Sequence, residues 1–479
     1  MRLPRYALAA ALLGAAASAQ AFSPDLVDLD ALPLLTTAVD QVQAKVAAVE
    51  ANPAEQRRFA VAAPLAAGLD QGVWDEVSAG QMRWRTRVFS AGAKSINLTF
   101  SQFALPSGAA LWLYDPQGRN VQGPYTRAEQ APDGKLWTAI VLGESAVIEL
   151  RVPKQARDAV ALQLASVNHG FRRFGTSGSI AKSGSCNIDV VCPLGDDWRD
   201  EIRSVALITI GGVGACSGQL VNNVRQNDDP LFLTADHCEI GDDAQHSPSS
   251  VVVYWNYETS VCGGNPDGSL SQNQTGSTLL ADDIGSDFTL LRLNQPPSNA
   301  FDVHYAGWNA GTTPPQSGVS IHHPSADEKR ISAYSIPAVK TDNVCIEYDG
   351  NNNCSRLVKT WEVKWAQGTT EQGSSGSGLW NQDHRIVGVL SGGLASCDAQ
   401  TQPDYYARLD AGWTAGSASS QQLKAHLDPD NTGTLTLAGK DPGPVTTPSG
   451  GGGGGGALGH WFVSAMLLGA ALRRRRIAG

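Results

Sequence analysis

Apolar and polar residues follow different patterns in successive parts of the chain. An apolar run from Ala7 to Ala17 follows two arginines near the N-terminus, and the stretch from Asp30 to Ala51 is typical of a helix. From about Gln81, apolar and polar residues alternate in short runs such as Met82–Phe89 and Ala146–Val152. Glycine, proline and aspartate clusters separate these runs. The pattern predicts short antiparallel strands, and therefore a small β-sandwich.

Residues 183–435 carry a second set of short apolar runs separated by glycine-rich turns. The clearest of these are Val205–Ile210, Val251–Trp255, Phe288–Leu293, Ile386–Leu390 and Tyr405–Leu409. About 250 residues of short strands fit a pair of antiparallel barrels packed face to face. The stretch Gln421–Leu427 is predicted to be a closing helix. The expected fold class is therefore all-β.

Both ends of the chain carry features of sorting signals. The first 21 residues have the charged, apolar and small-residue parts of a secretory signal peptide, cleaved after Ala21 or, alternatively, Ala19. Near the C-terminus, seven glycines precede an apolar stretch from Ala457 to Leu472 and four arginines. Sixteen helical residues span only about 24 Å, which is short for a bilayer core of about 30 Å. The pattern resembles the GlyGly-CTERM tails of Gram-negative bacteria, which an intramembrane protease removes; a retained membrane anchor is the alternative.

The composition limits the compartment in which the protein is expected to fold and the partners that it is expected to bind. The formal net charge is -10 and the pI about 5.4, so nothing indicates a nucleic-acid partner. All eight cysteines lie between Cys186 and Cys397, without zinc-ribbon or C-x-x-C spacing. An even number confined to one segment predicts a disulfide framework formed outside the cytoplasm, and no metal or other cofactor. Roughly 105 pairings are possible, so spacing alone leaves the connectivity open.

Three segments carry the groups that acyl transfer needs, in the order His237, Asp287, Ser375. This order belongs to the trypsin-like arrangement, whereas α/β-hydrolases have the order serine, acid, histidine. Ser375 is the predicted nucleophile, His237 the general base and Asp287 the group that orients the imidazole. Glycines flank the nucleophile loop, so the N–H groups of Gly373 and Ser375 are predicted to form the oxyanion hole.

Other residues are weaker candidates for chemistry. Asp282 and Asp283 lie close to Asp287 in sequence but are expected on a solvated loop. His322 and His323 are adjacent, yet no third ligand follows at zincin spacing, so structural histidines are favoured over a metal pair. The segment Asp428–Gly433 lacks the distal glutamate of a calcium loop and is predicted to be a turn.

The motifs resemble the secreted bacterial lysyl endopeptidases, trypsin-fold serine proteases that cut after lysine. The segments that carry the resemblance are Leu231–Cys238, Ser185–Pro193, Val253–Tyr257, Ser286–Leu291, Ile321–Pro324 and Glu371–Trp380. The resemblance implies a trypsin-like double antiparallel β-barrel for this part of the chain. It also implies protein and peptide substrates, and we expect a monomer that needs no cofactor.

The resemblance implies a set of specificity residues. In trypsin the pocket-floor aspartate lies six residues before the nucleophile, and here that place is the neutral Thr369. Asp404 matches the specificity aspartate of the lysyl endopeptidases, and Trp365 matches their pocket tryptophan. Ser391 and Gly393 match the segment on which the substrate backbone pairs as an extra strand. The lysine enzymes of the family often carry histidine at the place of Ser391.

Disulfide connectivity and processing are implied in the same way. The implied pairs are Cys186–Cys397, Cys192–Cys262 and Cys216–Cys238, which leaves Cys345–Cys354. Residues 172–185 are predicted to be an exposed linker of small residues, in which Lys182 stands just before the first cysteine, so the bond between Lys182 and Ser183 is a predicted self-processing site. Ser374 stands where trypsin has the aspartate that pairs with its new N-terminus. We therefore expect control by removal of the pro-segment, without a switching salt bridge.

One residue departs from the resembling family. Asp236 stands directly before His237, where the lysyl endopeptidases have histidine. We expect the Asp236 side chain to point away from the triad. If it lies close, its negative charge favours the imidazolium form of His237 and narrows activity at mildly acidic pH.

The triad motifs and the resemblance together imply a secreted serine endopeptidase that cuts after lysine. The alternatives are a broader lysine and arginine specificity, or a non-catalytic surface protein on the same fold. The predicted parts are a signal peptide (1–21), a mostly β pro-segment (22–182), the protease domain (183–440), a Pro/Gly-rich linker (441–456) and the sorting tail (457–479). A permanent carbohydrate- or wall-binding module is the alternative for 22–182. Expected processing partners are signal peptidase and a membrane protease for the tail, and the expected location is extracellular, with transient anchoring.

Overall fold

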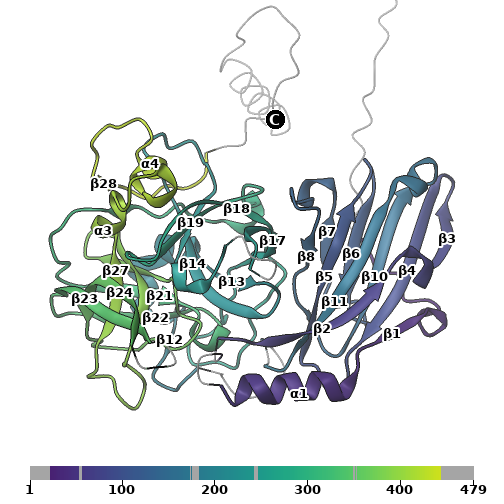
Figure 1. Cartoon of the computed structure of the whole chain (residues 1–479), viewed down its shortest axis with the longest axis horizontal. Helices are drawn as coiled ribbons and strands as arrows, with labels where there is room; N and C mark the ends of the chain where they lie inside the picture. Colours follow the sequence, from purple (N-terminus) through teal and green to yellow (C-terminus); the bar gives the residue numbers. More distant parts are fainter. Residues whose placement is uncertain are drawn as a thin grey trace, which may run out of the picture. The chain divides into compact units, whose positions relative to one another are not determined.

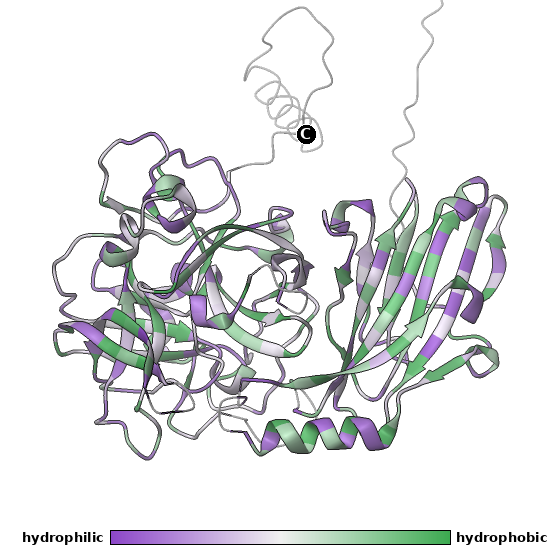
Figure 2. Cartoon of the chain, viewed as in Figure 1, coloured by the Kyte–Doolittle hydropathy of each residue, from purple (hydrophilic) through white to green (hydrophobic). Residues whose placement is uncertain are grey.

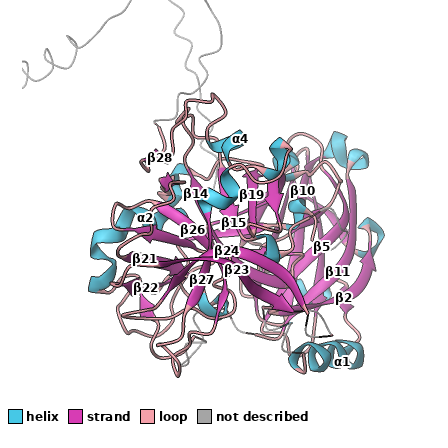
Figure 3. Cartoon of the chain, turned by 60° about the vertical axis from the view of Figure 1, so that its left-hand side comes forward, coloured by secondary structure: helices cyan, strands magenta, loops and turns pink. Residues whose placement is uncertain are grey.

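The computed structural model describes residues 22–52, 55, 57–172, 174, 183–241, 246–348, 351 and 353–443. The predicted signal peptide with Ala21, the processing residue Lys182 and the sorting tail lie outside the described residues. Strands dominate the described chain and its helices are short (Figure 3), so the all-β prediction is confirmed. Among these residues no helix is long and apolar enough to cross a membrane.

Residues 34–170 fold into two sheets that face each other (Figure 1). One sheet has the order β1 (Leu34–Thr36), β4 (Gln81–Phe89), β10 (Ser145–Pro153), β6 (Ala110–Tyr114) and β7 (Gln122–Tyr125), with β3 (Val73–Ser78) beside β4. The other has the order β2 (Ala60–Ala67), β11 (Ala161–Gly170), β5 (Ser95–Ala104) and β8 (Leu136–Trp137), with β9 (Val141–Leu142) beside β5. All pairs are antiparallel except β1 with β4. We call this part the N-terminal sandwich.

Alternation of side chains builds the core between the two sheets. Four residues of β10, Ala146, Ile148, Leu150 and Val152, belong to one buried apolar cluster. Successive side chains of a strand point to opposite faces, so this period of two gives the strand one apolar face. Figure 2 shows the resulting alternation of hydrophobic and hydrophilic residues along these strands. Each fully buried aliphatic side chain contributes about 1.5–3 kcal/mol.

The helix predicted from Asp30 to Ala51 forms only in its second half. The helix α1 spans Val39–Glu50, while Leu34–Thr36 is strand β1. Pro33 disfavours a helical conformation at the residue before it. The chain that follows gains strand hydrogen bonds instead, because Arg87 N–H donates to the Pro33 carbonyl and Thr37 N–H to the Phe89 carbonyl.

Residues 188–437 form two further curled sheets, the predicted double barrel. The first has the order β17 (Asn273–Thr275), β16 (Val252–Trp255), β13 (Val205–Ile210), β14 (Gly214–Val221), β15 (Leu231–Thr234), β19 (Phe288–Leu293) and β18 (Ser277–Asp283). The second has the order β12 (Ile188–Asp189), β22 (Arg330–Tyr334), β21 (Gly318–His322), β25 (Gly378–Asn381), β26 (Ile386–Gly393), β27 (Asp404–Arg408), β24 (Cys354–Val363) and β23 (Val339–Tyr348). In addition, β20 (Trp308–Asn309) pairs with β26, and β28 (Thr436–Leu437) pairs with β20.

Three short helices accompany the two barrels in the described chain: α2 (Arg199–Ser204), α3 (Leu409–Trp413) and α4 (Lys424–Leu427). The predicted closing helix over Gln421–Leu427 is thus shortened to one turn. A separate 3-10 turn, Ser419–Gln421, precedes it.

Four disulfides cross-link this C-terminal domain. They join Cys186 to Cys397, Cys192 to Cys262, Cys216 to Cys238 and Cys345 to Cys354. The first three are the pairs that the resemblance implies, and the fourth is the pair that these leave. Closing such loops limits the unfolded chain, typically by about 2–4 kcal/mol each. Two of them bear on the site: Cys216–Cys238 ties β14 to the turn that carries His237, and Cys345–Cys354 closes the β23–β24 hairpin.

The N-terminal sandwich packs on the first barrel through a shared apolar cluster. Phe59 and Trp137 of the sandwich are buried in this cluster with Val213 and Tyr254 of the barrel. The Phe59 N–H donates to the Val213 carbonyl at 2.9 Å, and the Ile140 N–H donates to the Tyr254 hydroxyl at 3.0 Å. The sandwich therefore contacts the barrel that carries His237.

Candidate active site

His237 and Asp287 meet at the end of two neighbouring strands. His237 lies in the short turn Asp236–Cys238 (η7) after β15, and Asp287 directly precedes β19, which pairs with β15. The Asp287 carboxylate is fully buried and accepts the His237 main-chain N–H at 2.9 Å. His237 Nδ1 lies 3.0 Å from Asp287 Oδ2 and 3.2 Å from Oδ1. This contact places the proton on Nδ1 and leaves Nε2 as the free acceptor.

Ser375 lies in the loop 371–377, between β24 and β25, and β14 holds this loop. The Ser217 N–H donates to the Ser375 carbonyl at 2.8 Å, and the Ser217 hydroxyl donates to the Gly373 carbonyl at 2.9 Å. Among the described residues, no hydrogen bond joins the Ser375 hydroxyl to His237 Nε2. This bond is often long in unliganded sites and tightens when substrate binds.

The loop also packs directly on the chain that leads to His237. Gly376 has φ +82°, and a Cβ atom there would lie 2.1 Å from Thr234 Oγ1 and 2.8 Å from the Ala235 nitrogen. Only glycine fits such a close approach. Because Cys216 precedes Ser217 and is bonded to Cys238, the disulfide and the Ser217 hydrogen bonds hold the histidine turn and the serine loop on the same part of β14.

Two N–H groups of this loop are available to a bound oxyanion. Within the described chain, neither Gly373 N–H nor Ser375 N–H has a main-chain acceptor, whereas Ser374 N–H donates to the Glu371 carbonyl. Gly373 has φ +93°, and a Cβ atom would lie 2.9 Å from the Ala326 nitrogen. The two free donors match the groups predicted from the sequence for an oxyanion hole.

Asp404 is a buried carboxylate of the second barrel. It is 1% exposed, and its Oδ2 accepts from Trp365 Nε1 and from Thr370 Oγ1, both at 2.7 Å. Its Oδ1 accepts from the Ala395 N–H at 3.2 Å. Trp365 was predicted to shield this carboxylate. Thr370 was missed, because a threonine in a Thr-Thr pair carries no sequence signal of its own.

No cation partners Asp404 among the described residues; its hydrogen-bond donors are neutral. Burial raises its pKa to about 6, and these hydrogen bonds lower it only in part. Gly393 faces the carboxylate from β26, because a Cβ atom there would lie 1.9 Å from Asp404 Oδ1. Burying a carboxylate without a cation is costly, so this position favours a positively charged partner.

Thr369 and Ser391, two further positions considered in the sequence analysis, carry no charge. The neutral Thr369 is buried and accepts the Ser332 hydroxyl on its main-chain oxygen, so no charge occupies the place of trypsin's pocket aspartate. Ser391 is 5% exposed, and within the described chain its hydroxyl has no hydrogen-bond partner. It lies in β26 two residues before Gly393, on the edge predicted to receive the substrate backbone.

The expectation that Asp236 points away from the triad is wrong. Its carboxylate pairs with the Arg356 guanidinium, and Arg356 Nη1 lies 3.2 Å from Asp287 Oδ1. Burial raises the pKa of Asp236, while Arg356 opposes this shift. Arg356 was missed by the sequence analysis because it comes from β24, far from His237 and Asp287 in the chain. On another side of the turn, Arg57 of the N-terminal sandwich donates to the His237 carbonyl.

The weaker candidates for chemistry from the sequence analysis make hydrogen bonds that support the structure. His322 is fully buried between the hydroxyls of Ser374 and Ser332, and burial lowers its pKa to about 3, so it is neutral. His323 Nδ1 contacts the Asp327 carbonyl instead of a shared metal position. Asp283 accepts from the N–H and hydroxyl of Ser286, and thereby caps the turn before Asp287.

The Asp428–Gly433 segment is a turn, as predicted. The Asp428 carboxylate accepts the N–H groups of Thr432 and Gly433. Elsewhere, Asp200, His304 and Asp441 have potential ligand atoms within 4.8 Å of one another. Arg203 pairs with both aspartates, so the cation at that place is a guanidinium.

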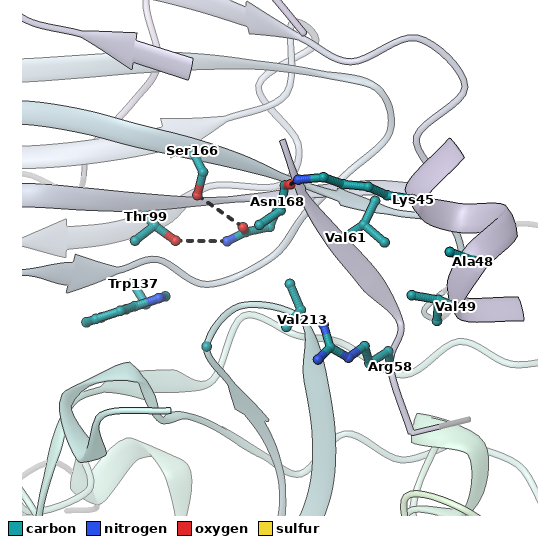
Figure 4. A pocket seen from close by; sticks show the side chains of 12 residues that line it. Lys45, Ala48, Val49, Arg58, Val61, Thr99, Trp137, Ser166, Asn168 and Val213 are labelled. Carbon is teal, nitrogen blue, oxygen red and sulfur yellow. Dashed lines mark hydrogen bonds between the residues drawn. The ribbon is translucent and has the colours of Figure 1, made fainter. Parts of the chain in front are cut away.

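A pocket of about 440 Å³ lies away from these groups, where α1 and β2 of the N-terminal sandwich meet the turn before β14 (Figure 4). Lys45, Val61, Trp137, Asn168 and Val213 are among its lining residues. It contains none of the predicted site residues. It is a gap at the packing boundary between the sandwich and the first barrel.

Comparison with known proteins places this chain in a family. Residues 31–171 match the lysyl endopeptidase N-terminal domain, and residues 180–407 match the lysyl endopeptidase C-terminal domain. The lysyl endopeptidase of Pseudomonas aeruginosa is 28% identical over 372 residues, which cover 70% of this chain and 74% of that protein.

Two solved protease structures are also similar to part of the chain. The Rv3671c protease of M. tuberculosis, in its active form, is 15% identical with a TM-score of 0.31, and the match covers 49% of this chain and 88% of that one. A Glu endopeptidase is 18% identical with a TM-score of 0.29, and the match covers 49% of this chain and 93% of that one. Since the two family domains together span well over half of its residues, the chain belongs to the lysyl endopeptidase family of serine endopeptidases.

Proposed function

We propose that the chain is a secreted endopeptidase that hydrolyses the peptide bond after lysine through Ser375, His237 and Asp287. The observation that carries the lysine specificity is the buried Asp404, which has neutral hydrogen-bond donors and no cation among the described residues. A lysine ammonium supplies the missing charge. Thr370 and Trp365 hold the carboxylate toward it and keep water away.

The chemistry follows from the groups around Ser375. His237 Nε2 takes the proton of the Ser375 hydroxyl as its oxygen attacks the carbonyl carbon after lysine. The N–H groups of Gly373 and Ser375 stabilise the oxyanion that forms. The imidazolium returns its proton to the leaving amine, which leaves an acyl-enzyme. Water then repeats the two steps and releases the new carboxylate, while Asp287 keeps the ring in the tautomer that both steps need.

Specificity for lysine over arginine follows from the direction of the carboxylate. Asp404 enters from β27, and its Oδ1 faces Gly393 of β26, so the charge comes from the pocket wall. Thr369 leaves the place of trypsin's floor aspartate neutral. A carboxylate on the wall stops close to a compact ammonium, whereas the wider planar guanidinium needs more room. A broader lysine and arginine specificity is the second candidate, because Ser391 replaces the larger histidine of the family's lysine enzymes.

Processing and location are part of the same proposal. Lys182 precedes Ser183, so the enzyme can release its own mature start, and residues 22–182 act as a pro-segment that packs on the first barrel. Four disulfides and the signal-peptide pattern support secretion. Signal peptidase and a membrane protease that removes the tail are the processing partners.

The test is hydrolysis of three matched chromogenic peptides that end in lysine, arginine or norleucine, with Ser375→Ala as the inactive control. We expect cleavage of the lysine peptide at least about a hundredfold faster than that of the other two. Equal rates with lysine and arginine establish the broader specificity. A wild-type protein no more active than Ser375→Ala contradicts the proposed catalytic function.

Asp404→Asn is expected to lower kcat/KM for lysine peptides by about 10³-fold or more, because it removes the carboxylate charge proposed to face the ammonium. The amide is isosteric and keeps part of the hydrogen bonding with Thr370 and Ala395. Acylation of Ser375 by a small neutral active-site reagent should therefore continue at nearly the wild-type rate. The same change at Asp428, a buried aspartate of the turn Asp428–Gly433 that also accepts from neutral donors, is the matched control. An Asp404→Asn enzyme that retains its lysine preference places the recognition carboxylate elsewhere.

The raised pKa of Asp404 predicts a pH-dependent specificity. The carboxylate must be ionised to bind the ammonium, so recognition is complete above the pKa of about 6 and is lost as the pH falls through it. The ratio of kcat/KM for lysine and norleucine peptides cancels the titration of the triad, because both substrates need it equally. We expect this ratio to fall about tenfold per pH unit below about pH 6. A ratio that is constant from about pH 5 to 8 contradicts this role.

A further inference from the structure

We propose that Arg356 is a positioning residue of the triad, which neutralises Asp236 and fixes Asp287 Oδ1 against His237. This proposal rests on the catalytic roles proposed for Asp287 and His237. Arg356 Nη1 contacts the Asp236 carboxylate and lies 3.2 Å from Asp287 Oδ1. The Arg356 side chain is 9% exposed, so this guanidinium acts in a nearly closed environment.

The position of Arg356 follows from the β23–β24 hairpin. Arg356 lies opposite Glu347 in this hairpin, and its Nε lies 3.2 Å from the Glu347 carboxylate. The Cys345–Cys354 disulfide closes the hairpin immediately beside it. The hairpin belongs to the second barrel, whereas Asp287 belongs to the first. Arg356 is therefore a charged contact between the second barrel and the acid of the triad.

The charges around His237 explain what the guanidinium does. Asp236 precedes the imidazole in η7, Asp287 contacts it from the start of β19, and Glu347 reaches Arg356 from β23. From the sandwich, Arg57 donates to the His237 carbonyl and pairs with Glu239. Without Arg356, the carboxylates of Asp236 and Asp287 face the ring without their shared cation. Both then favour the protonated ring, which cannot accept the Ser375 proton.

Arg356→Gln tests this charge effect. The acid limb of kcat/KM for a lysine peptide should move up by about one pH unit, since a nearby opposite charge shifts a titration by about 1–3 units. In the Ser375→Ala background, the midpoint of the His237 ring titration followed by NMR should move in the same direction. The double variant Arg356→Gln with Asp236→Asn removes one cation and one carboxylate, and should return both readouts toward wild type.

Arg408→Gln is the matched control. Arg408 is equally buried in the same barrel, and its contacts are with Asp342 and Asp410 rather than the triad. If Arg356 has only a structural role, its replacement lowers kcat/KM at every pH but leaves the acid limb of the pH profile at its wild-type position. The proposal is overturned if Arg356→Gln keeps the wild-type limb and NMR midpoint, or if the double variant stays fully shifted. A wild-type protein that does not cleave lysine peptides contradicts the proposed function instead. In that case the NMR titration of the His237 ring still decides the role of Arg356.

A separate observation concerns the residue that processing makes the N-terminus. Ser183 is buried, and its N–H and hydroxyl lie 3.2 Å and 2.9 Å from Asp327 Oδ2. Asp327 belongs to a buried cluster in which Arg330 pairs with three carboxyl groups, those of Asp189, Asp327 and Glu328. Burial and the neighbouring Asp327 raise the pKa of Glu328 to about 8. The cluster thus holds more acids than cations, at the place where a new amino group arises.

The same segment contacts the loop that carries Ser375. Glu371 accepts from the Gly184 N–H and from Asn187 Nδ2, both at 2.7 Å, and from the Ser325 hydroxyl at 2.8 Å. Ser325 and Ala326 both have positive φ, of 55° and 54°, a conformation that costs free energy in residues other than glycine. Ala326 packs on Gly373, one of the two proposed oxyanion donors.

We infer that hydrolysis at Ser183, which consumes one water molecule and leaves an ammonium group there, creates a buried ion pair with Asp327. This pair, together with Glu371, then holds the loop from Glu371 to Ser375 in its active form. This inference departs from the expectation of control without a switching salt bridge: Ser374 replaces trypsin's aspartate, and Asp327 supplies the carboxylate from another loop. The inference rests on the proposed cleavage after Lys182.

The test compares two mature enzymes made from the full-length precursor. Residues 180–182 are replaced by a site for an unrelated protease, which releases either Ser183 or one additional glycine as the first residue. The extended form displaces the ammonium, and we expect its kcat/KM and its rate of Ser375 acylation by a small neutral probe to fall about tenfold or more. Asp327→Asn should cost a similar factor, and combining the two changes should cost little more.

The proposed ion pair is overturned if the mature enzymes with and without the additional glycine are equally active. It is also overturned if the losses caused by the glycine and by Asp327→Asn add in full. Mass spectrometry of the N-terminus and a thermal unfolding scan show that each form is correctly cut and folded. If neither start cleaves lysine peptides, the proposed function fails. The acylation rate of Ser375 still distinguishes the two starts in that case.

Discussion

The residues Cys216 and Ser217 of β14 are the constraint on which the site depends. One is bonded to Cys238, beside His237, and the other donates to the carbonyls of Gly373 and Ser375. A histidine from the first barrel and a serine from the second are thereby held on one strand. Removing the cross-link or the Ser217 hydroxyl loosens the distance between base and nucleophile. Neither barrel alone carries all three residues, so the proposed catalysis requires that the two barrels stay packed.

Three buried acids differ in the cations that lie beside them. Asp287 has a cation in Arg356, Asp404 has none among the described residues, and Asp327 shares Arg330 with other acids beside Ser183, the proposed new N-terminus. A buried carboxylate is expensive when it is unpaired, by several kcal/mol. The three acids therefore differ in how the cost is offset: by Arg356 for Asp287, by the proposed lysine substrate for Asp404, and by Arg330 together with the proposed new ammonium group for Asp327. The free-energy cost of burying a carboxylate therefore links the fold to the proposed specificity and activation.

The sequence predicted the elements that depend on local pattern. Alternation located the strands β4, β6 and β10, and residue order placed His237, Asp287 and Ser375 in one arrangement. It missed the strand at Leu34–Thr36, because pairing with β4 outweighs helical preference there. It also missed Arg356, Thr370 and Asp327, whose partners lie far away in the chain. Such contacts depend on barrel packing, and a single arginine or threonine carries no pattern that reveals it.

The central claim is that Ser375 is activated beside a pocket made for a lysine side chain. A direct measurement is labelling of the purified mature protein with aminoalkyl phosphonate diesters that carry either a lysine or a norleucine side chain, followed by peptide mapping. The account predicts that the phosphonate attaches to Ser375 alone, and that the lysine reagent reacts at least about a hundredfold faster than the norleucine reagent. Attachment at another residue, or equal rates for the two reagents, would contradict it.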